Sequence, residues 1–206
     1  MGNLLRAIDA NETNGASIYY AMKIKAYLPV RSTELCQAKW EEIDFEKAIW
    51  TVPGERMKMR RPHIVPLPRQ VIDLLRELQP FSGNSPYLFP SHRKIGVPIS
   101  RSSLLRALES LGYKGIMTAH GFRGMFSTMC NRMRLPSDII ERNLAHAGRD
   151  QVALAYDHYD YLKEKREVLQ TWADYLDKLR DGQLPSTMDT PKIPAGQTES
   201  MDQGEA

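Results

Sequence analysis

The polar residues between positions 120 and 156 include the types that phosphate chemistry requires. They are His120, Arg123, His146 and Tyr156. A phosphodiester under attack gains negative charge on its non-bridging oxygens, so its site needs cations that are fixed in advance. Arginine meets this need because its planar guanidinium bonds two oxygens at once and never deprotonates. These residue types indicate a site that holds a phosphate and lets a phenol attack it.

His120 and Arg123 are three residues apart, which on a helix places both side chains on one face. The run from 122 to 134 carries apolar residues at helical spacing (Phe122, Phe126, Met129 and Met133), so a helix is predicted there. A pair that faces a phosphate is one interpretation. A core helix with two solvated polar residues is the other, and the pair alone does not exclude it.

Tyr156 is the candidate nucleophile. It follows His146 by ten residues and lies just after a predicted short helical run over 151–155. A phenol has a pKa near ~10, so it attacks only where neighbouring cations or a base activate it. Tyr159 and Tyr161 stand close by, and tyrosine is also common in cores and on surfaces. The cluster therefore does not by itself identify the attacking residue.

A further arginine, Arg31, stands at a predicted helix start. Pro29 should end the preceding helix, which places Arg31 at the beginning of the next short one. Glu34, three residues on, can share the face of Arg31 and orient its guanidinium. An ion pair on the surface is an equally good interpretation of these two residues.

A basic segment separates two predicted strands, 47–52 and 63–67. It contains four cationic residues, Arg56, Lys58, Arg60 and Arg61. In an extended chain the cations at 56, 58 and 60 share one face, and Met57 and Met59 share the other. Such a hairpin commonly forms a solvated or phosphate-positioning face. A lysine at its tip can also reach into a neighbouring site as a proton donor.

Composition indicates a soluble, intracellular protein. The 206 residues are 42% hydrophobic and 26% charged, which suits one globular domain or at most two. No run approaches ~20 apolar residues, and no leader pattern is present, so no membrane partner is expected. Cys36 and Cys130 are far apart in sequence and are expected to be buried thiols rather than a disulfide or zinc site. No phosphate-cradling Gly-Lys loop or paired acidic metal motif occurs.

The net charge of +3 is divided unevenly along the chain. From Asp181 onward one base, Lys192, faces five acids, so this polar tail carries −4 and the first 180 residues carry +7. The tail is too polar to fold alone and is predicted to be disordered. A basic body with a detached acidic tail suits a nucleic-acid partner.

Periodicity predicts a mainly α-helical protein with a small antiparallel β-sheet, an α+β fold. The helices are expected at 3–10 capped by Asn3, 16–28, 68–79 with Pro80 as the stop, 100–111, 136–144 and about 162–180. In the helix at 100–111 the leucines 104, 105, 108 and 111 are expected to face inward. The last helix carries an apolar stripe that either packs on its own domain or docks on a neighbouring copy.

Taken in order, these residues resemble the catalytic domain of the tyrosine recombinases, or phage integrases. The matching features are Arg31 with Glu34, Lys58 in a basic hairpin, His120-x-x-Arg123, Leu144-Ala145-His146 and Tyr156. The phrase at 55–67 is particularly similar to the P4-type integrases of prophages and genomic islands. So are Ala155-Tyr156 and the segment 161–176. The resemblance covers about residues 15–180.

The resemblance implies a role for each matching residue. Arg31 and Arg123 would clamp the scissile phosphate, His146 would hydrogen-bond it, and Glu34 would support the site from behind. Lys58 would act as general acid toward the leaving 5′ oxygen, and His120 would assist as acid or base. Tyr156 would form a 3′-phosphotyrosyl link; the family's nucleophile follows the second histidine by about this gap. Neither ATP nor a metal cofactor is expected, because the covalent link conserves the bond energy.

The resemblance also implies partners and domains. The partner would be double-stranded DNA at attachment sites, cut within a synaptic tetramer, with DNA-bending or excision accessory proteins; the isolated domain is expected to be a monomer. Residues 1–180 would form the catalytic domain and 181–206 the acidic tail. The family's N-terminal core-binding and arm-binding domains are expected to be absent from this chain. A bacterial, cytoplasmic, nucleoid-associated location would follow.

Two departures and three alternatives remain. Pro29-Val30 stands where the family commonly has Gly-Leu, and Ala145 stands where glycine usually precedes the histidine. A type IB-like topoisomerase uses nearly the same residues to relax supercoils. A DNA-binding regulator with an idle site would keep the fold without the chemistry. An unrelated all-helical scaffold would have neither.

Overall fold

The computed structural model describes residues 1–11, 15–57, 60–146 and 161–183. Lys58 and Tyr156, and the tail from residue 184, lie outside this part. The α-helices are α1 (Gly2–Asp9), α2 (Ala16–Tyr27), α3 (Ser32–Cys36), α4 (Arg69–Ser82), α5 (Arg101–Ser110), α6 (Gly121–Arg132), α7 (Ser137–Asn143) and α8 (Leu162–Arg180). Two short 3-10 helices, η2 (Trp40–Glu42) and η3 (Gly54–Arg56), flank the strands. The predicted α+β fold is confirmed.

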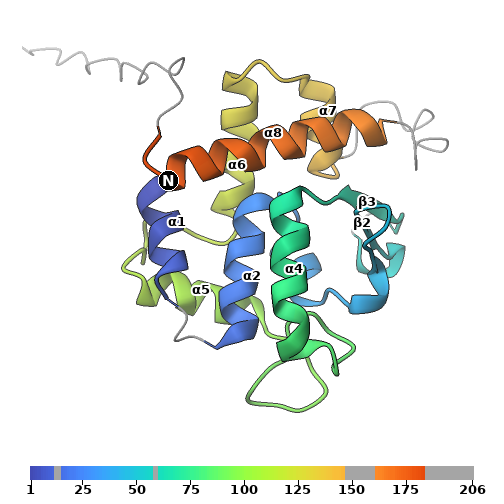
Figure 1. The fold of residues 1–206 in the computed structure, drawn as a ribbon, viewed down its shortest axis with the longest axis vertical. Helices are drawn as coiled ribbons and strands as arrows, with labels where there is room; N and C mark the ends of the chain where they lie inside the picture. The colour runs from blue at the N-terminus through green and yellow to red at the C-terminus, as the bar shows by residue number, and fades with distance from the viewer. Residues whose placement is uncertain (12–14, 58–59, 147–160, 184–206) are drawn as a thin grey trace, which may run out of the picture.

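Helix α2 lies at the centre of the helical layer and packs against α1, α4, α5 and α8. Figure 1 shows α1, α2 and α4 side by side, with α8 running across one end of all three. Buried apolar residues of α2 include Ala21, Met22 and Ile24. The core is thus built around the helix that immediately precedes Arg31.

Helix α8 packs on its own domain through its apolar stripe, which was the first of the two predicted alternatives. Its buried apolar residues are Val168, Leu169, Trp172, Ala173 and Leu176. The Trp172 indole N–H donates to the carbonyl of Ala26 at 3.1 Å, and the Tyr27 hydroxyl donates to the Asp177 carboxylate at 2.6 Å. These bonds fix α8 against the end of α2.

The sheet has three antiparallel strands in the order β1 (Ile43–Asp44), β2 (Ile49–Val52) and β3 (His63–Pro66). The predicted hairpin is confirmed: Val52 lies opposite His63, so β2 and β3 are joined by the basic segment. All four residues of β3 are buried, because the strand packs against β2 and α8. The short β1 was not predicted, since two residues show no alternation.

Three local predictions were wrong. The first helix begins at Gly2, and the Asn3 side chain accepts a hydrogen bond from Arg6 instead of capping the helix. Helix α4 continues through Pro80 to Ser82, because Pro80 lies on the exposed side where water can bond the carbonyl freed by its missing N–H. Leu105 is exposed rather than inward-facing. Each error concerns a residue near a helix end or on its boundary face.

The two cysteines are buried thiols, as predicted. Burial raises the pKa of Cys36 to about 11 and that of Cys130 to about 12. No helix in the described ranges is both long and apolar enough to cross a membrane.

Candidate functional site

Arg123 stands in the first turn of α6 and is only 5% exposed. Its Nη1 donates to the carbonyl of Pro29, and its Nη2 donates to the carbonyl of Leu144 at 2.7 Å. These two carbonyls belong to segments that are 115 positions apart in sequence. The guanidinium therefore joins the loop before α3 to the end of α7.

Arg31 is the N-cap residue of α3, as the predicted helix start required. Both oxygens of the buried Glu34 carboxylate hold it: Oε2 accepts the backbone N–H of Arg31 at 2.7 Å, and Oε1 accepts Nη1 at 2.8 Å. Glu34 is 2% exposed, whereas the Arg31 side chain is 31% exposed. The carboxylate thus fixes the guanidinium from the protein side and leaves its outer edge open.

Helix α7 ends in a Schellman turn whose left-handed residue is Ala145, with φ +50°. The Ala145 N–H bonds the carbonyl of Arg142, and the His146 N–H bonds the carbonyl of Glu141, both at 3.1 Å. The turn requires φ > 0 at this position, and glycine adopts such values without strain. This explains why glycine is usual there in the family that the sequence resembles. The turn leaves the carbonyls of Leu144 and Ala145 free to accept bonds from other segments.

The turn also brings together the side chains of Glu141 and His146. Nδ1 of His146 lies 2.6 Å from a Glu141 carboxylate oxygen, and Nε2 lies 3.2 Å from Nη2 of Arg123. Nη2 of Arg31 lies 3.5 Å from the carbonyl of Ala145. Arg31, Arg123 and His146 therefore converge on residues 144–146.

Glu141 was missed by sequence reasoning. Its signal was its position five residues before His146. A Schellman turn places the third-last residue of a helix (C3, here Glu141) next to the second residue after the C-cap (C″, here His146). Recognising it required knowing that the helix ends at Leu144 with Ala145 in the left-handed region.

The site brings together two guanidinium groups, of Arg31 and Arg123, and two carboxylates, of Glu34 and Glu141. Burial, followed by the charge of Arg31, lowers the pKa of Arg123, and the nearby Glu34 and Glu141 carboxylates partly offset this effect. Arginine nevertheless stays protonated in proteins. Two neighbouring guanidinium groups destabilise each other, so an anion bound between them relieves that repulsion.

Lys25 is a second residue that sequence reasoning missed. It is fully buried in α2 and its ammonium donates to the carbonyl of Val30, next to the Pro29 carbonyl that Arg123 bonds. Burial, and then the charge of Arg123, lowers the pKa of Lys25 to about 7. Lys25 and Arg123 together fix the loop that presents Arg31.

A buried polar cluster of His63, Asn143 and Lys165 joins β3, α7 and α8 behind the site. The Lys165 ammonium donates to the carbonyl of Ile64, and the Asn143 amide reaches the carbonyl of Lys165 at 3.5 Å. Burial, followed by the charge of Lys165, lowers the pKa of His63 to about 3, despite a hydrogen bond to the Asn143 backbone. The cluster connects the hairpin that contains Lys58 with the turn that presents His146.

His120 does not join this convergence. It is the N-cap residue of α6 and is exposed, and its ring has no hydrogen-bond partner among the described residues. The two other predicted reacting groups, Lys58 and Tyr156, lie outside the described residues.

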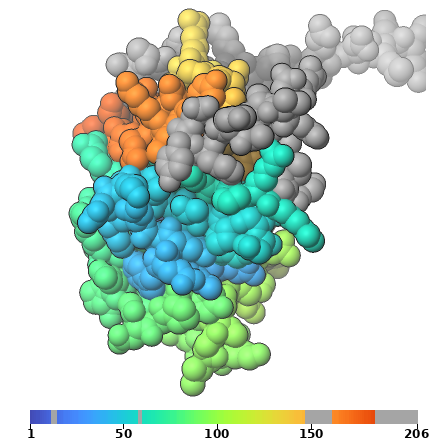
Figure 2. All heavy atoms as spheres, turned by 90° about the vertical axis from the view of Figure 1, so that its right-hand side faces the viewer, coloured from blue at the N-terminus to red at the C-terminus, as the bar shows by residue number. Residues whose placement is uncertain are grey.

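The three candidate DNA-binding arginines of the hairpin differ in their surroundings. Arg56 donates to the Glu42 carboxylate and to the carbonyl of Gln37, and its side chain is 18% exposed. Arg60 and Arg61 are exposed. Figure 2 faces this side of the molecule and shows hairpin residues, in teal, projecting from the surface. Only Arg60 and Arg61 thus present free surface to a partner in this arrangement.

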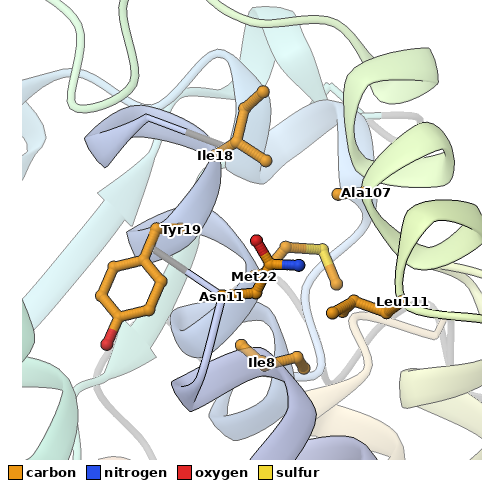
Figure 3. A pocket seen from close by; sticks show the side chains of 7 residues that line it. All are labelled: Ile8, Asn11, Ile18, Tyr19, Met22, Ala107 and Leu111. Carbon is orange, nitrogen blue, oxygen red and sulfur yellow. The ribbon is translucent and has the colours of Figure 1, made fainter. Parts of the chain in front are cut away.

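A small pocket opens elsewhere, between α1, α2 and α5 (Figure 3). Its lining residues are Ile8, Asn11, Ile18, Tyr19, Met22, Ala107 and Leu111. None of them is charged at neutral pH, so the pocket lacks the cations that a phosphate requires.

Comparison with known proteins gives a consistent set of relatives. The model of the phage integrase family matches residues 2–163. Prophage integrase IntA of Escherichia coli (strain K12) is 37% identical over 157 residues, which are 76% of this chain and 38% of IntA. The integrase of Enterobacteria phage P4 is 39% identical over 177 residues, covering 78% of this chain and 40% of the phage protein.

The fold also matches solved structures. The XerH site-specific recombinase, solved bound to its difH substrate in a pre-cleavage complex, superposes with a TM-score of 0.59 at 22% identity. The match covers 76% of this chain and 48% of XerH. This chain spans about two fifths of the length of the curated integrases named above.

Proposed function

The chain belongs to the phage integrase family, and we propose that it carries the catalytic site of a tyrosine-type site-specific DNA recombinase, which integrates or excises mobile DNA. The observation that carries the proposal is the convergence of Arg31, Arg123 and His146 on one turn. Two cations and an imidazole at one place suit a phosphodiester whose charge grows during attack.

The proposed reaction exchanges one ester bond for another. The Tyr156 phenol oxygen attacks phosphorus and loses its proton to a base, for which His120 is the candidate. The bond from phosphorus to the 5′ oxygen breaks, and Lys58 protonates that oxygen. Glu34 keeps Arg31 oriented throughout. The phosphotyrosyl bond keeps the energy of the broken ester, so rejoining needs no ATP and no metal cofactor is invoked.

The proposed partner is double-stranded DNA at an attachment site. A solved relative, XerH, was captured with its DNA substrate, which supports this assignment by fold. Cleavage of two duplexes and their exchange requires four active sites, so a synaptic tetramer is proposed, with accessory DNA-bending or excision proteins. A place in the bacterial cytoplasm, at the nucleoid, follows from that partner.

The test is covalent capture of DNA by the 206-residue chain. Nicked duplexes randomised around the nick trap a phosphotyrosyl adduct, because the short cleaved strand diffuses away. The wild-type chain and a Tyr159→Phe control should form an adduct on a denaturing gel, and Tyr156→Phe should form none while still shifting DNA on a native gel. An adduct in Tyr156→Phe would refute the assignment of the nucleophile.

Two assays on the same 206-residue chain distinguish the alternative functions. Relaxation of supercoiled plasmid without strand exchange would favour a type IB-like topoisomerase. DNA binding without any adduct from the randomised pool would favour a regulator with an idle site. Neither alternative is favoured by the relatives, which are integrases and recombinases.

A further inference from the structure

Glu141 and His146 form a hydrogen-bonded pair for which the family resemblance provides no role. Nδ1 of His146 lies 2.6 Å from Oε2 of Glu141, and both side chains are 49% exposed. The Schellman turn at the end of α7 sets this contact, because it places residue C″ beside residue C3. The backbone of the turn therefore places these two side chains within reach of each other.

The hydrogen-bond partners of the imidazole determine where its proton is. Carboxylate oxygens only accept, so Nδ1 must carry a hydrogen to bond Glu141. Guanidinium nitrogens only donate, so Nε2 must present a lone pair to Nη2 of Arg123 at 3.2 Å. In this arrangement His146 is neutral and protonated on Nδ1. Its Nε2 accepts a hydrogen bond from the arginine that is proposed to bind phosphate.

A bound phosphodiester changes this balance. Its oxygens are acceptors, so they would draw the N–H of Arg123 and would meet a lone pair on Nε2 of His146. Two acceptors facing each other repel, unless Nε2 takes up a proton and becomes a donor. The half-exposed ring can take this proton from solvent.

Three charged groups from three elements act on that proton within the described part of the chain. Arg123 from α6 and Arg31 from the start of α3 disfavour a second positive charge beside them. Glu141 from α7 favours it, through a hydrogen bond to the charged form. The incoming phosphate adds a second negative group and reinforces Glu141.

We propose that Glu141 is a positioning residue that fixes His146 in its Nδ1-protonated form and lets it gain a proton on Nε2 when a phosphodiester binds. His146 thereby changes from an acceptor for Arg123 into a donor to phosphate. This inference rests on the proposed function, because it requires a phosphate at the site. One proton is taken up for each phosphate bound, and no bond other than N–H is made.

The experiment uses ¹⁵N spectra of the histidine rings in the 206-residue chain. The nitrogen shifts distinguish the two neutral tautomers from the imidazolium, and His146→Gln assigns the signals. Dimethyl phosphate is the probe, since it mimics a diester and stays a monoanion across the pH range used. In the free chain near pH 7 we expect His146 as the neutral Nδ1–H tautomer, and at saturation with dimethyl phosphate we expect the imidazolium.

The test variant is Glu141→Gln, and the matched control is Glu77→Gln on the exposed face of α4. The Glu141 side chain takes no part in the backbone bonds of the turn, so the variant should fold. Loss of the charge should weaken binding of dimethyl phosphate on the order of tenfold, because charge-assisted hydrogen bonds are about twice as strong as neutral ones. The wild type and the control should bind more weakly as pH rises, and Glu141→Gln should show a much smaller dependence.

Each outcome bears on a different claim. If dimethyl phosphate binds but His146 stays neutral, or if Glu141→Gln binds it as the control does, the positioning role of Glu141 is wrong and the phosphate site stands. If the free chain shows the Nε2–H tautomer, the role is also wrong. If dimethyl phosphate does not perturb His146 or the guanidinium signals of Arg31 and Arg123, the phosphate site itself is wrong.

Discussion

The guanidinium groups of Arg56 and Arg123 show how the same residue type serves two different purposes in this protein. Arg56 bonds the Glu42 carboxylate, so its charge is neutralised within the fold. The described partners of Arg123 are two carbonyls and an imidazole nitrogen, which orient the group without cancelling its charge. Position in the fold, and not residue type, therefore separates a structural arginine from one that can bind an anion.

Ala145 carries the backbone strain of the site. Its φ of +50° places the residue in the left-handed region, which costs an L-residue with a Cβ about 1–2 kcal/mol. We expect Ala145→Gly to stabilise the chain, by about 0.5–1 kcal/mol after the greater freedom of glycine in the unfolded chain is subtracted.

Urea unfolding measures this effect. The control is Ala7→Gly in α1, where the backbone is helical and glycine should instead destabilise by about 0.5–1 kcal/mol. If both substitutions destabilised equally, backbone strain at Ala145 would be excluded as a cost to the turn.

At the scale of elements, the site depends on how β3, α7 and α8 are held together. The His63–Asn143–Lys165 cluster crosses all three, and it joins elements whose neighbouring loops carry Lys58 and His146. The Lys165 ammonium and the Asn143 amide N–H bond carbonyls of neighbouring elements, and a shift of these elements would break the buried bonds. The cluster thus links the hairpin to the end of α7, which leads into the turn at 144–146.

The burial of His63 makes stability depend on pH. Its pKa falls to about 3 in the fold, against about 6.5 when unfolded. Between these values the unfolded chain binds a proton that the folded chain does not, so stability is lost as pH falls below about 6.5. The slope from this group is about 1.4 kcal/mol per pH unit.

Comparison of His63→Gln with the wild type isolates that slope. Between pH 7 and pH 5 the wild type should lose about 1–2 kcal/mol more stability than His63→Gln in urea titrations. His92→Gln, at an exposed loop histidine, should retain the wild-type slope. Equal slopes in all three proteins would show that His63 is accessible to protons in the folded state.

At the scale of the whole molecule, the first 180 residues carry a net charge of +7. Phosphate contacts release counterions from DNA, so affinity should fall steeply with salt. The exposed Arg61 of the hairpin is the residue that we expect to add one such contact.

Arg61→Gln should therefore weaken binding to duplex DNA of any sequence and reduce the slope of log K against log salt by about 1. Fluorescence anisotropy at several salt concentrations measures both quantities. Arg76→Gln, on the exposed face of α4, serves as the control. An unchanged slope in Arg61→Gln would show that Arg61 makes no phosphate contact.

The sequence alone determined which segments are regular and the order of the candidate residues. Helices α2 and α8 and the hairpin of β2 and β3 were predicted close to their observed ends, because hydrophobic periodicity and turn residues are local signals. Arg31 and Glu34 were paired correctly for the same reason: two residues that are three positions apart at a helix start lie on one face.

Only the tertiary structure decided which distant groups meet. The partners of Lys25, the Arg123 bond to Pro29 and the pairing of Arg56 with Glu42 join elements whose relative placement no local pattern encodes. Glu141 lies between these cases, since its contact is local but depends on a left-handed residue that alanine seldom adopts. Packing brings the charges together, and their proximity then sets which of them are neutralised and which remain available to a phosphate.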